Sequence, residues 1–359
     1  MFKKISVFLL LAVFLFTGAS CISTKKATET GPMGVFKSVD RGDKWTAAMA
    51  LPTAQGVKSI SGVKTYRLFE DPGDPNAFYL ASRGQGLYYT YDSGDSWSAV
   101  SFFNGKFVYT AAVDPADKCT IYASDGQHIY KSEDCTRTWN LMFTEERSGE
   151  RVSSMDIDPS DGSIYAVEIG GDLLVSRDQG RSWQALKRFT TALQDVFIDK
   201  SVPGRIYVAT QHAYLVRSDD AGANWTDLKD SFKKFNDSKV YYRMSVSKSQ
   251  KDTIFWISKY GILRSTDAGT TWAELKLLTP PGAVTIYGFA INEKNPNEMY
   301  YTGTILGENN THVRSTFYKS ADGGATWVTQ KLPTNTIPVV IKIHPTNDAM
   351  LFMGFALLN

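Results

Sequence analysis

The sequence predicts an all-β fold, a seven-bladed β-propeller of four-stranded blades, from two observations. The first is a motif of the form Ser/Thr-x-Asp-x-Gly-x-x-Trp, which occurs seven times along the 359 residues. Seven of the eight tryptophans end a copy of it, at Trp45, Trp97, Trp139, Trp183, Trp225, Trp272 and Trp327. The second is the distance between successive tryptophans, which ranges from 42 to 55 residues. A self-similar period of about 40 to 50 residues is typical of propeller blades.

Each copy of the motif has the composition of a tight hairpin turn. Its Asp can accept hydrogen bonds from backbone N–H groups of the same turn, and its Gly suits a positive φ. Its Trp begins the next strand and buries a large apolar surface. The aspartates are Asp40, Asp92, Asp134, Asp178, Asp220, Asp267 and Asp322. A feature that recurs in every repeat is structural, whereas a metal or catalytic site occurs once, so we interpret these carboxylates as structural.

The third copy departs from the pattern. Thr136 stands where the other copies have Gly, and Cys135 lies beside it. We expect this turn to be distorted or to need a crosslink. Cys119 and Cys135 flank one predicted hairpin, and in an exported protein an even pair of cysteines indicates a disulfide.

Between the motifs the same order of strands returns: an apolar strand, a turn, a strand with a central aromatic residue, and a hairpin into the motif. The aromatic residues are Tyr79, Tyr122, Tyr165, Tyr207, Phe255, Tyr300 and Phe352. Their β-rich surroundings fit strands buried between neighbouring blades. Six complete units lie between the first and last motifs. We predict that residues 34–45 join the C-terminal strands 337–343 and 350–355 in a seventh blade, which closes the ring and removes an exposed edge.

The N-terminus has the composition of a targeting segment. Lys3 and Lys4 precede an apolar run, residues 5–16, that is too short to cross a membrane. Small residues then precede Cys21, which resembles a bacterial lipobox and implies lipidation of this Cys. We expect a signal peptide over 1–20, a polar tether over 21–33 and one propeller domain over 34–359. The protein would then be an exported, membrane-anchored lipoprotein at the periplasmic face or cell surface; plain secretion and an uncleaved anchor are the alternatives.

Charge and metal-ligand content argue against several kinds of partner. The 39 basic and 37 acidic residues give a formal charge of +2, so no global field favours nucleic acid. The four histidines have no spacing that would complete a metal site with the cysteines. We therefore predict no metal, no cofactor and no nucleic-acid partner, and we expect a monomer.

The seven motifs resemble the Asp-box, or bacterial neuraminidase repeat. This box is shared by sialidases, sortilin-type receptors, xyloglucan-cleaving glycoside hydrolases and photosystem II assembly factors. In those families it lies at the turn between the third and fourth strands of a blade, away from the functional face. The resemblance covers nearly the whole mature chain and is specific for fold rather than for function. It implies that function lies on the opposite face, called here the upper face.

Residue types that dominate binding sites recur toward this upper face. At the upper ends of the inner strands stand Tyr66, Arg67, Tyr109, Asp195, Tyr242, Arg243 and Tyr287. Tyr and Arg are enriched in binding hot spots, so we predict a partner site there; the alternative is that these tyrosines only pack between blades. Upper-face loops add Arg83, Glu168 and His212, and the longest loop, 304–315, adds Asn310 and Arg314.

Three functions fit these residues. The first, which we predict, is a non-catalytic, surface-tethered scaffold that binds protein in the cell envelope, similar in plan to the photosystem II assembly factors. The second is a glycoside hydrolase, for which Asp125, Glu168, Asp172 and Asp195 could supply the two carboxylates, about 5–9.5 Å apart, that such hydrolysis needs. The third is a carbohydrate-binding module, in which exposed tyrosines stack on sugar rings.

Overall fold

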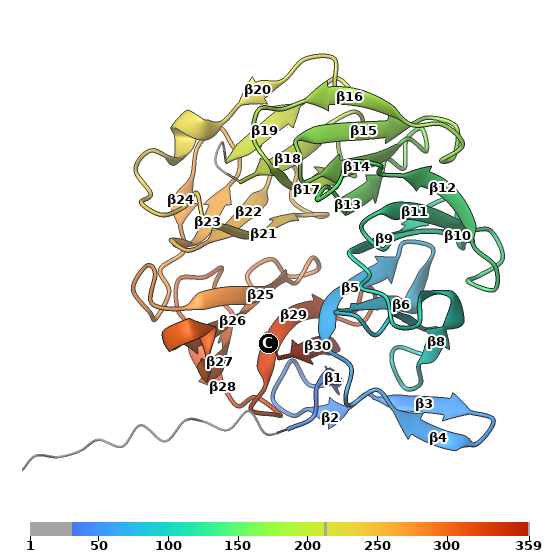
Figure 1. Cartoon of the computed structure of the whole chain (residues 1–359). Coiled ribbons are helices and arrows are strands. Elements are labelled where there is room, and N and C mark those ends of the chain that lie inside the picture. The colour runs from blue at the N-terminus through green and yellow to red at the C-terminus, as the bar shows by residue number, and fades with distance from the viewer. Residues whose placement is uncertain (1–30, 212–213, 358–359) are drawn as a thin grey trace, which may run out of the picture.

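The computed structural model describes residues 31–211 and 214–357, and it forms a ring of seven four-stranded antiparallel sheets (Figure 1). This confirms the predicted fold class. The predicted signal peptide, the lipidated Cys21, most of the tether and His212 lie outside the described residues.

Six blades follow the order of the chain. The first contains β5 (Thr65–Asp71), β6 (Asp74–Ser82), β7 (Leu87–Thr90) and β8 (Ser98–Val100); the second β9 (Thr110–Asp114), β10 (Asp117–Ser124), β11 (His128–Ser132) and β12 (Asn140–Thr144); the third β13 (Val152–Ile157), β14 (Ile164–Glu168), β15 (Asp172–Ser176) and β16 (Gln184–Arg188). The fourth contains β17 (Leu193–Ile198), β18 (Ile206–Thr210), β19 (Leu215–Ser218) and β20 (Thr226–Asp227); the fifth β21 (Tyr241–Val246), β22 (Ile254–Ser258), β23 (Gly261–Ser265) and β24 (Ala273–Glu274); the sixth β25 (Thr285–Ile291), β26 (Met299–Leu306), β27 (His312–Ser320) and β28 (Val328–Gln330). Three short 3₁₀ helices, η1 (Ser101–Phe103), η2 (Lys229–Phe232) and η3 (Glu308–Asn310), lie in the connections.

The two ends of the described chain share the seventh blade, as predicted. Its strand order is β2 (Thr46–Ala47), β1 (Gly34–Ser38), β30 (Leu351–Ala356) and β29 (Ile337–Ile343). β1 pairs antiparallel with β30 over its full length, from Gly34 opposite Phe355 to Ser38 opposite Leu351. The first and last segments of the propeller are therefore hydrogen-bonded to each other, and the ring is closed.

The repeated motif forms the same turn in all seven blades, between the third and fourth strands. The Asp side chain accepts a hydrogen bond from the backbone N–H four residues later, at 2.8–2.9 Å. The Ser or Thr hydroxyl accepts one from the N–H of the Gly position, at 2.8–3.0 Å. The Gly position has φ between 74° and 91°, a left-handed conformation that favours glycine.

The third turn was expected to be distorted or to need a crosslink; it has the geometry of the other turns, and the crosslink is present. Thr136 adopts φ 74° in place of glycine, and its N–H still donates to Ser132 Oγ at 2.9 Å. Asp134 keeps its bond from the Thr138 N–H at 2.8 Å. These bonds hold the backbone against the cost of a side chain in this region, which is about 1–2 kcal/mol. Cys119 and Cys135 form a disulfide beside the turn.

The core lies between adjacent blades. The seven aromatic residues predicted at the centre of the second strands are 0–1% exposed. Tyr79 of the first blade, for example, shares a cluster with Ile121 of the second. The motif tryptophans differ in burial more than the shared pattern predicts. Trp97 is 1% exposed, whereas Trp45 and Trp225 are half-buried.

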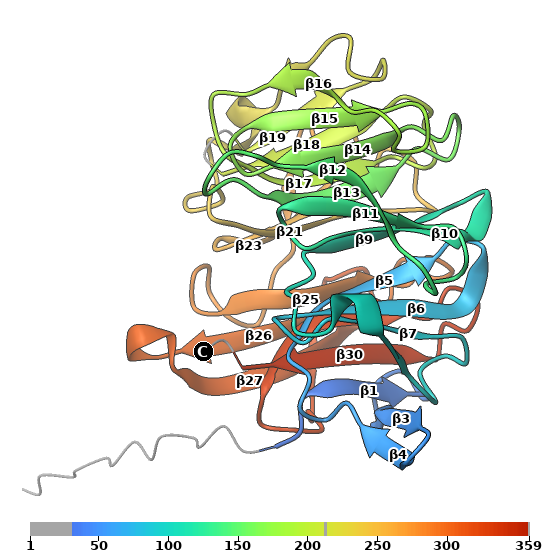
Figure 2. The same ribbon diagram turned by 45° about the vertical axis from the view of Figure 1, so that its right-hand side comes forward.

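Two segments depart from the regular blade. A two-stranded hairpin, β3 (Ala50–Thr53) and β4 (Gly56–Ser59), projects outside the ring and lengthens the first repeat (Figure 2). The predicted long loop 304–315 is instead an extended hairpin, because Ile305 pairs with Arg314 and Leu306 with His312. Only the turn between β26 and β27, with η3 in it, is irregular.

Candidate functional site

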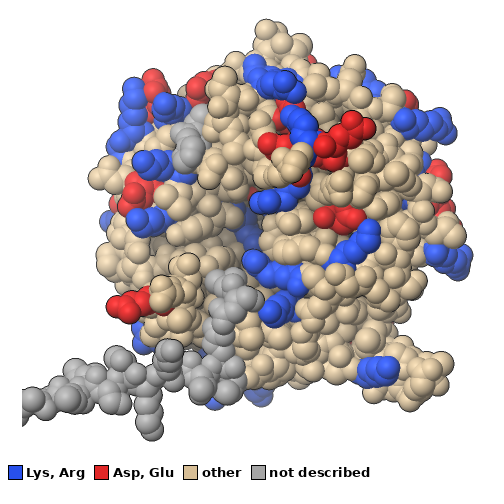
Figure 3. All heavy atoms as spheres, in the orientation of Figure 1, with Lys and Arg blue, Asp and Glu red and all other residues tan. Residues whose placement is uncertain are grey.

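The upper face is the face on which the second strand of a blade turns into the third and the chain crosses to the next blade. Lys and Arg side chains gather around the centre of this face (Figure 3). We call the residues there the central cluster: Tyr66, Arg67, Arg83, Phe107, Tyr109, Arg151, Asp195, Tyr241 and Arg243. They come from three inner strands, β5, β17 and β21, and from connections at the upper ends of the strands.

One half of the central cluster is aromatic. The ring centroid of Phe107 lies 4.9 Å from that of Tyr66 and 4.2 Å from that of Tyr109. The guanidinium groups of Arg83 and Arg151 lie 5.1 Å from the Tyr66 ring and 5.4 Å from the Tyr109 ring, respectively, which is within cation–π range. All three rings are half-buried, so part of each faces solvent.

The other half of the central cluster is ionic. Arg67 Nη2 lies 2.7 Å from Asp195 Oδ1, and the Tyr241 hydroxyl donates to Asp195 Oδ2 at 2.8 Å. Burial opposes the charge of Arg67, but the Asp195 carboxylate outweighs it and raises the pKa of Arg67. Arg243 donates to the carbonyl of Val339 at 3.0 Å, and burial together with the charge of Arg67 lowers the pKa of Arg243. Two arginines therefore share one carboxylate, which leaves an excess positive charge.

The structure brings together most of the residues predicted at the upper ends of the inner strands. Tyr66, Arg67, Arg83, Tyr109, Asp195 and Arg243 belong to the central cluster. Tyr242 and Tyr287 form a second aromatic pair on β21 and β25, with their rings 6.4 Å apart. Asn310 and Arg314 are exposed on the projecting hairpin of the sixth blade instead.

Sequence reasoning missed three members of the central cluster. Phe107 and Tyr241 have no aromatic counterparts at equivalent positions of the other repeats, and Arg151 lies in a connection. All three lie near the upper end of an inner strand: Phe107 is three residues before β9, Arg151 directly precedes β13, and Tyr241 is the first residue of β21. A search that included the residues flanking each aligned position would have found them.

Glu168 is not a surface ligand. It is 1% exposed and belongs to what we call the Arg147 network: Glu145, Arg147, Glu168, Asp172 and Arg188. Arg147 donates to Glu145 at 2.7 Å, to Glu168 at 2.5 Å and to Asp172 at 2.7 Å. Arg188 also donates to Asp172, at 2.6 Å. The prediction that Glu168 contacts a partner directly is therefore wrong, because Arg147 lies over its carboxyl group.

Three carboxylates and two guanidinium groups leave the Arg147 network one positive charge short. Burial and the neighbouring Glu145 raise the pKa of Glu168 to about 8, whereas the Arg147 hydrogen bond lowers the pKa of Glu145 to about 2. Glu168 is thus the member that holds a proton at neutral pH, and this proton removes the excess negative charge.

This protonation predicts a pH dependence of stability. The pKa of Glu168 is about 8 in the folded chain against 4.5 as its ordinary value, so the folded state binds the extra proton between these values. Stability should fall as pH rises through this range, with a limiting slope of about 1.4 kcal/mol per pH unit. Glu168→Gln mimics the protonated form. Its free energy of unfolding, measured by urea unfolding, should therefore not fall with pH on account of this residue between these two pKa values. Glu146→Gln, at an exposed neighbour, should unfold like the wild type at every pH; a decline that persists in Glu168→Gln would contradict the assignment.

The described residues offer neither a metal centre nor a membrane span. In ranges 31–211 and 214–357, no group of three or more His, Cys, Asp or Glu side chains is arranged to hold a metal ion. Within the same ranges, no helix has the length and apolar composition needed to cross a bilayer.

The chain is similar to propellers of two kinds. It is 26% identical over 332 residues to a xyloglucanase of Paenibacillus sp., an alignment that covers 77% of this chain and 30% of the enzyme. It is 28% identical over 182 residues to the photosystem II assembly lipoprotein Ycf48 of Prochlorococcus marinus, covering 48% of this chain and 50% of that protein. It therefore spans less than a third of the length of the xyloglucanase and half that of Ycf48.

A solved structure shares the fold over nearly the whole chain, and a family profile matches most of it. The structure of YCF48 bound to D1 peptide superposes with a TM-score of 0.59 at 15% identity, covering 92% of this chain and 97% of YCF48. Residues 105–352 match the DUF6242 beta propeller domain. The chain belongs to the DUF6242 beta-propeller family.

Proposed function

We propose that this chain is a non-catalytic scaffold of the bacterial cell envelope, tethered at Cys21, that holds a protein partner on its upper face at the central cluster. The observation that supports this most is the packing of three half-buried aromatic rings against arginine side chains. Tyr and Arg are the residue types enriched in binding hot spots, and here they lie on an inner strand or in the connections at the upper ends of the strands.

The charge of the central cluster favours a partner that brings a carboxylate. Arg67 is neutralised by Asp195, whereas Arg243, which lies beside this cation, donates to a carbonyl oxygen and forms no ion pair within residues 31–211 and 214–357. A carboxylate placed there would relieve the repulsion between Arg67 and Arg243.

The relatives support a binding role and an anchor. A protein of the same fold is described as bound to a D1 peptide, and Ycf48 is described as an assembly lipoprotein. For this chain, a protein ligand and lipidation at Cys21 are proposals that agree with those descriptions.

Glycan binding or glycoside hydrolysis is the second candidate, because the alignment with a xyloglucanase covers most of this chain. The carboxylates of the upper face favour the scaffold instead. Asp125 pairs with Lys106 at 2.7 Å, Asp172 with Arg188 at 2.6 Å and Asp195 with Arg67 at 2.7 Å. Glu168 is buried beneath Arg147. A general acid or nucleophile has to reach the substrate, and each of these carboxyl groups is engaged by a cation of the protein.

The central cluster can be tested with a photo-crosslinker in place of Phe107. Substituting both Arg83 and Arg151 with Ala should lower the yield of crosslinked protein adducts by about tenfold, since hot-spot residues each contribute more than about 1 kcal/mol. Arg137→Ala with Arg181→Ala, two exposed arginines in turns of the opposite face, is the matched control and should leave the yield unchanged. An equal yield from both double variants would contradict the assignment.

The second candidate has a separate test. We expect no release of reducing sugar from xyloglucan by the purified protein. Release that is lost in Glu168→Gln or Asp195→Asn would favour hydrolysis and contradict the scaffold.

A further inference from the structure

The third strand of the sixth blade has an upper half with no outer neighbour among the described residues. β27 is nine residues long, and β28 pairs only with its Phe317, Tyr318 and Lys319. On the inner side, β26 continues to pair with β27 up to His312. Among the described residues, positions 313–316 therefore have no strand partner on their outer side, and alternate residues there turn their backbone N–H and C=O groups outward.

The second and third blades leave no such edge. β12 pairs with β11 up to His128, the first residue of β11, and β16 pairs with β15 up to Asp172, the first residue of β15. In the sixth blade the chain leaves the sheet after Gln330, and Pro333, which has no N–H to donate, follows soon after. The open edge is a local property of the long β26–β27 hairpin.

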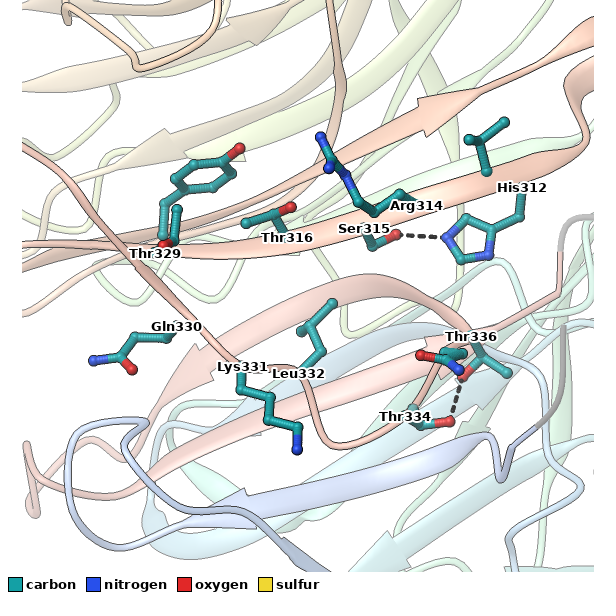
Figure 4. Close-up of a pocket in the computed structure, with 13 residues that line it drawn as sticks. His312, Arg314, Ser315, Thr316, Thr329, Gln330, Lys331, Leu332, Thr334 and Thr336 are labelled. Atoms are coloured by element: carbon teal, nitrogen blue, oxygen red, sulfur yellow. Dashed lines mark hydrogen bonds between the residues drawn. The ribbon is translucent and has the colours of Figure 1, made fainter. Parts of the chain in front are cut away.

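A groove of about 690 Å³ lies along this edge (Figure 4). The upper half of β27 forms one wall, and residues 329–336 form the other. Leu332 points into the space between them, and Val313 on β27 is 48% exposed. An added strand lies about 4.8 Å from its neighbour, so the groove offers such a strand both a backbone edge and apolar contacts.

The groove is basic. Arg314 and Lys331 line it, and none of its lining residues is an aspartate or glutamate. Within residues 31–211 and 214–357, neither Arg314 nor Lys331 forms an ion pair, unlike Arg67, Arg147 and Arg188 of the upper face. Two uncompensated cations beside an open strand edge favour a ligand with acidic side chains.

We propose that this edge binds an extended peptide segment with acidic side chains, which adds to β27 as a further strand in line with β28. The backbone ladder would supply affinity, and carboxylates that reach Arg314 and Lys331 would supply selectivity. The groove is separate from the central cluster, so this proposal does not depend on the partner proposed for that cluster.

The probe is a library of random peptides displayed on phage and selected against the immobilised protein. We expect the enriched peptides to be rich in Asp, Glu and β-branched residues. Made synthetically, they should bind Arg314→Glu/Lys331→Glu at least about tenfold more weakly than wild type. Lys58→Glu/Arg137→Glu makes the same change in net charge at exposed sites elsewhere and should bind like the wild type.

Backbone pairing is tested on the peptide itself. Two versions of the best peptide carry N-methyl groups on alternate residues, one on the even and one on the odd positions. Because alternate residues of a strand face opposite neighbours, one version should lose binding and the other keep it. The proposal is overturned if no acidic peptide is enriched, if the charge reversal and its control weaken binding equally, or if both methylated peptides bind alike.

Discussion

Replacing Trp97 with alanine is expected to lower the free energy of unfolding by about 3–5 kcal/mol, as truncation of a large buried aromatic residue does. Trp97 is 1% exposed and packs in the cluster that joins the first and seventh blades. Its indole N–H donates to the Ala48 carbonyl at 2.9 Å. The substitution would leave a cavity at the contact where the ring closes, together with a carbonyl that loses its partner.

Urea unfolding of the purified protein measures this cost. Trp225→Ala is the matched control, since Trp225 ends the same motif but is half-buried, so its loss should cost clearly less. Equal costs for both variants would show that the motif tryptophans act only within their own turns.

Replacing Arg147 with alanine has the second largest expected effect, a loss of about 3–5 kcal/mol at neutral pH, because it removes the cation from buried carboxylates. The side chains of Glu145, Glu168 and Asp172 are only 4%, 1% and 3% exposed. Without Arg147 the carboxylates repel one another, so the loss should shrink as the pH falls and they take up protons.

Arg188→Ala is the control for this variant. Arg188 also pairs with Asp172, but its side chain is 72% exposed, and exposed pairs contribute at most about 1 kcal/mol. Thermal unfolding at several pH values separates the two variants. An Arg147→Ala protein that is as stable as Arg188→Ala would contradict the network as described.

The fold could be predicted because its signals are local and repeated. Each turn has a hydroxyl and a carboxylate that accept backbone hydrogen bonds, and a tryptophan that begins the next strand. A single sequence pattern therefore located the turn between the third and fourth strands of every blade. The closing blade followed from counting strands, and the pairing of β1 with β30 confirmed it. Thr136 shows the limit of this reasoning, because backbone N–H groups that donate to Ser132 and Asp134 hold its turn without glycine.

The central cluster could be predicted only in part. Alignment of the inner strands located Tyr66, Arg67 and Arg243, because they occupy equivalent positions. It did not reveal that Asp195 neutralises Arg67. That contact joins inner strands of different blades, and the two residues are 128 positions apart in the sequence. The burial of Glu168 was missed for the same reason: Arg147, which covers it, comes from the connection between two blades.

The measurement that tests the account most directly is in-cell photo-crosslinking from position 107, followed by mass spectrometry. A crosslinker at Val39, a 62% exposed residue in a turn of the opposite face, is the reference. We predict one reproducible envelope protein crosslinked from position 107 and not from position 39. The same set of products from both positions, or adducts with polysaccharide alone, would contradict a protein-binding scaffold.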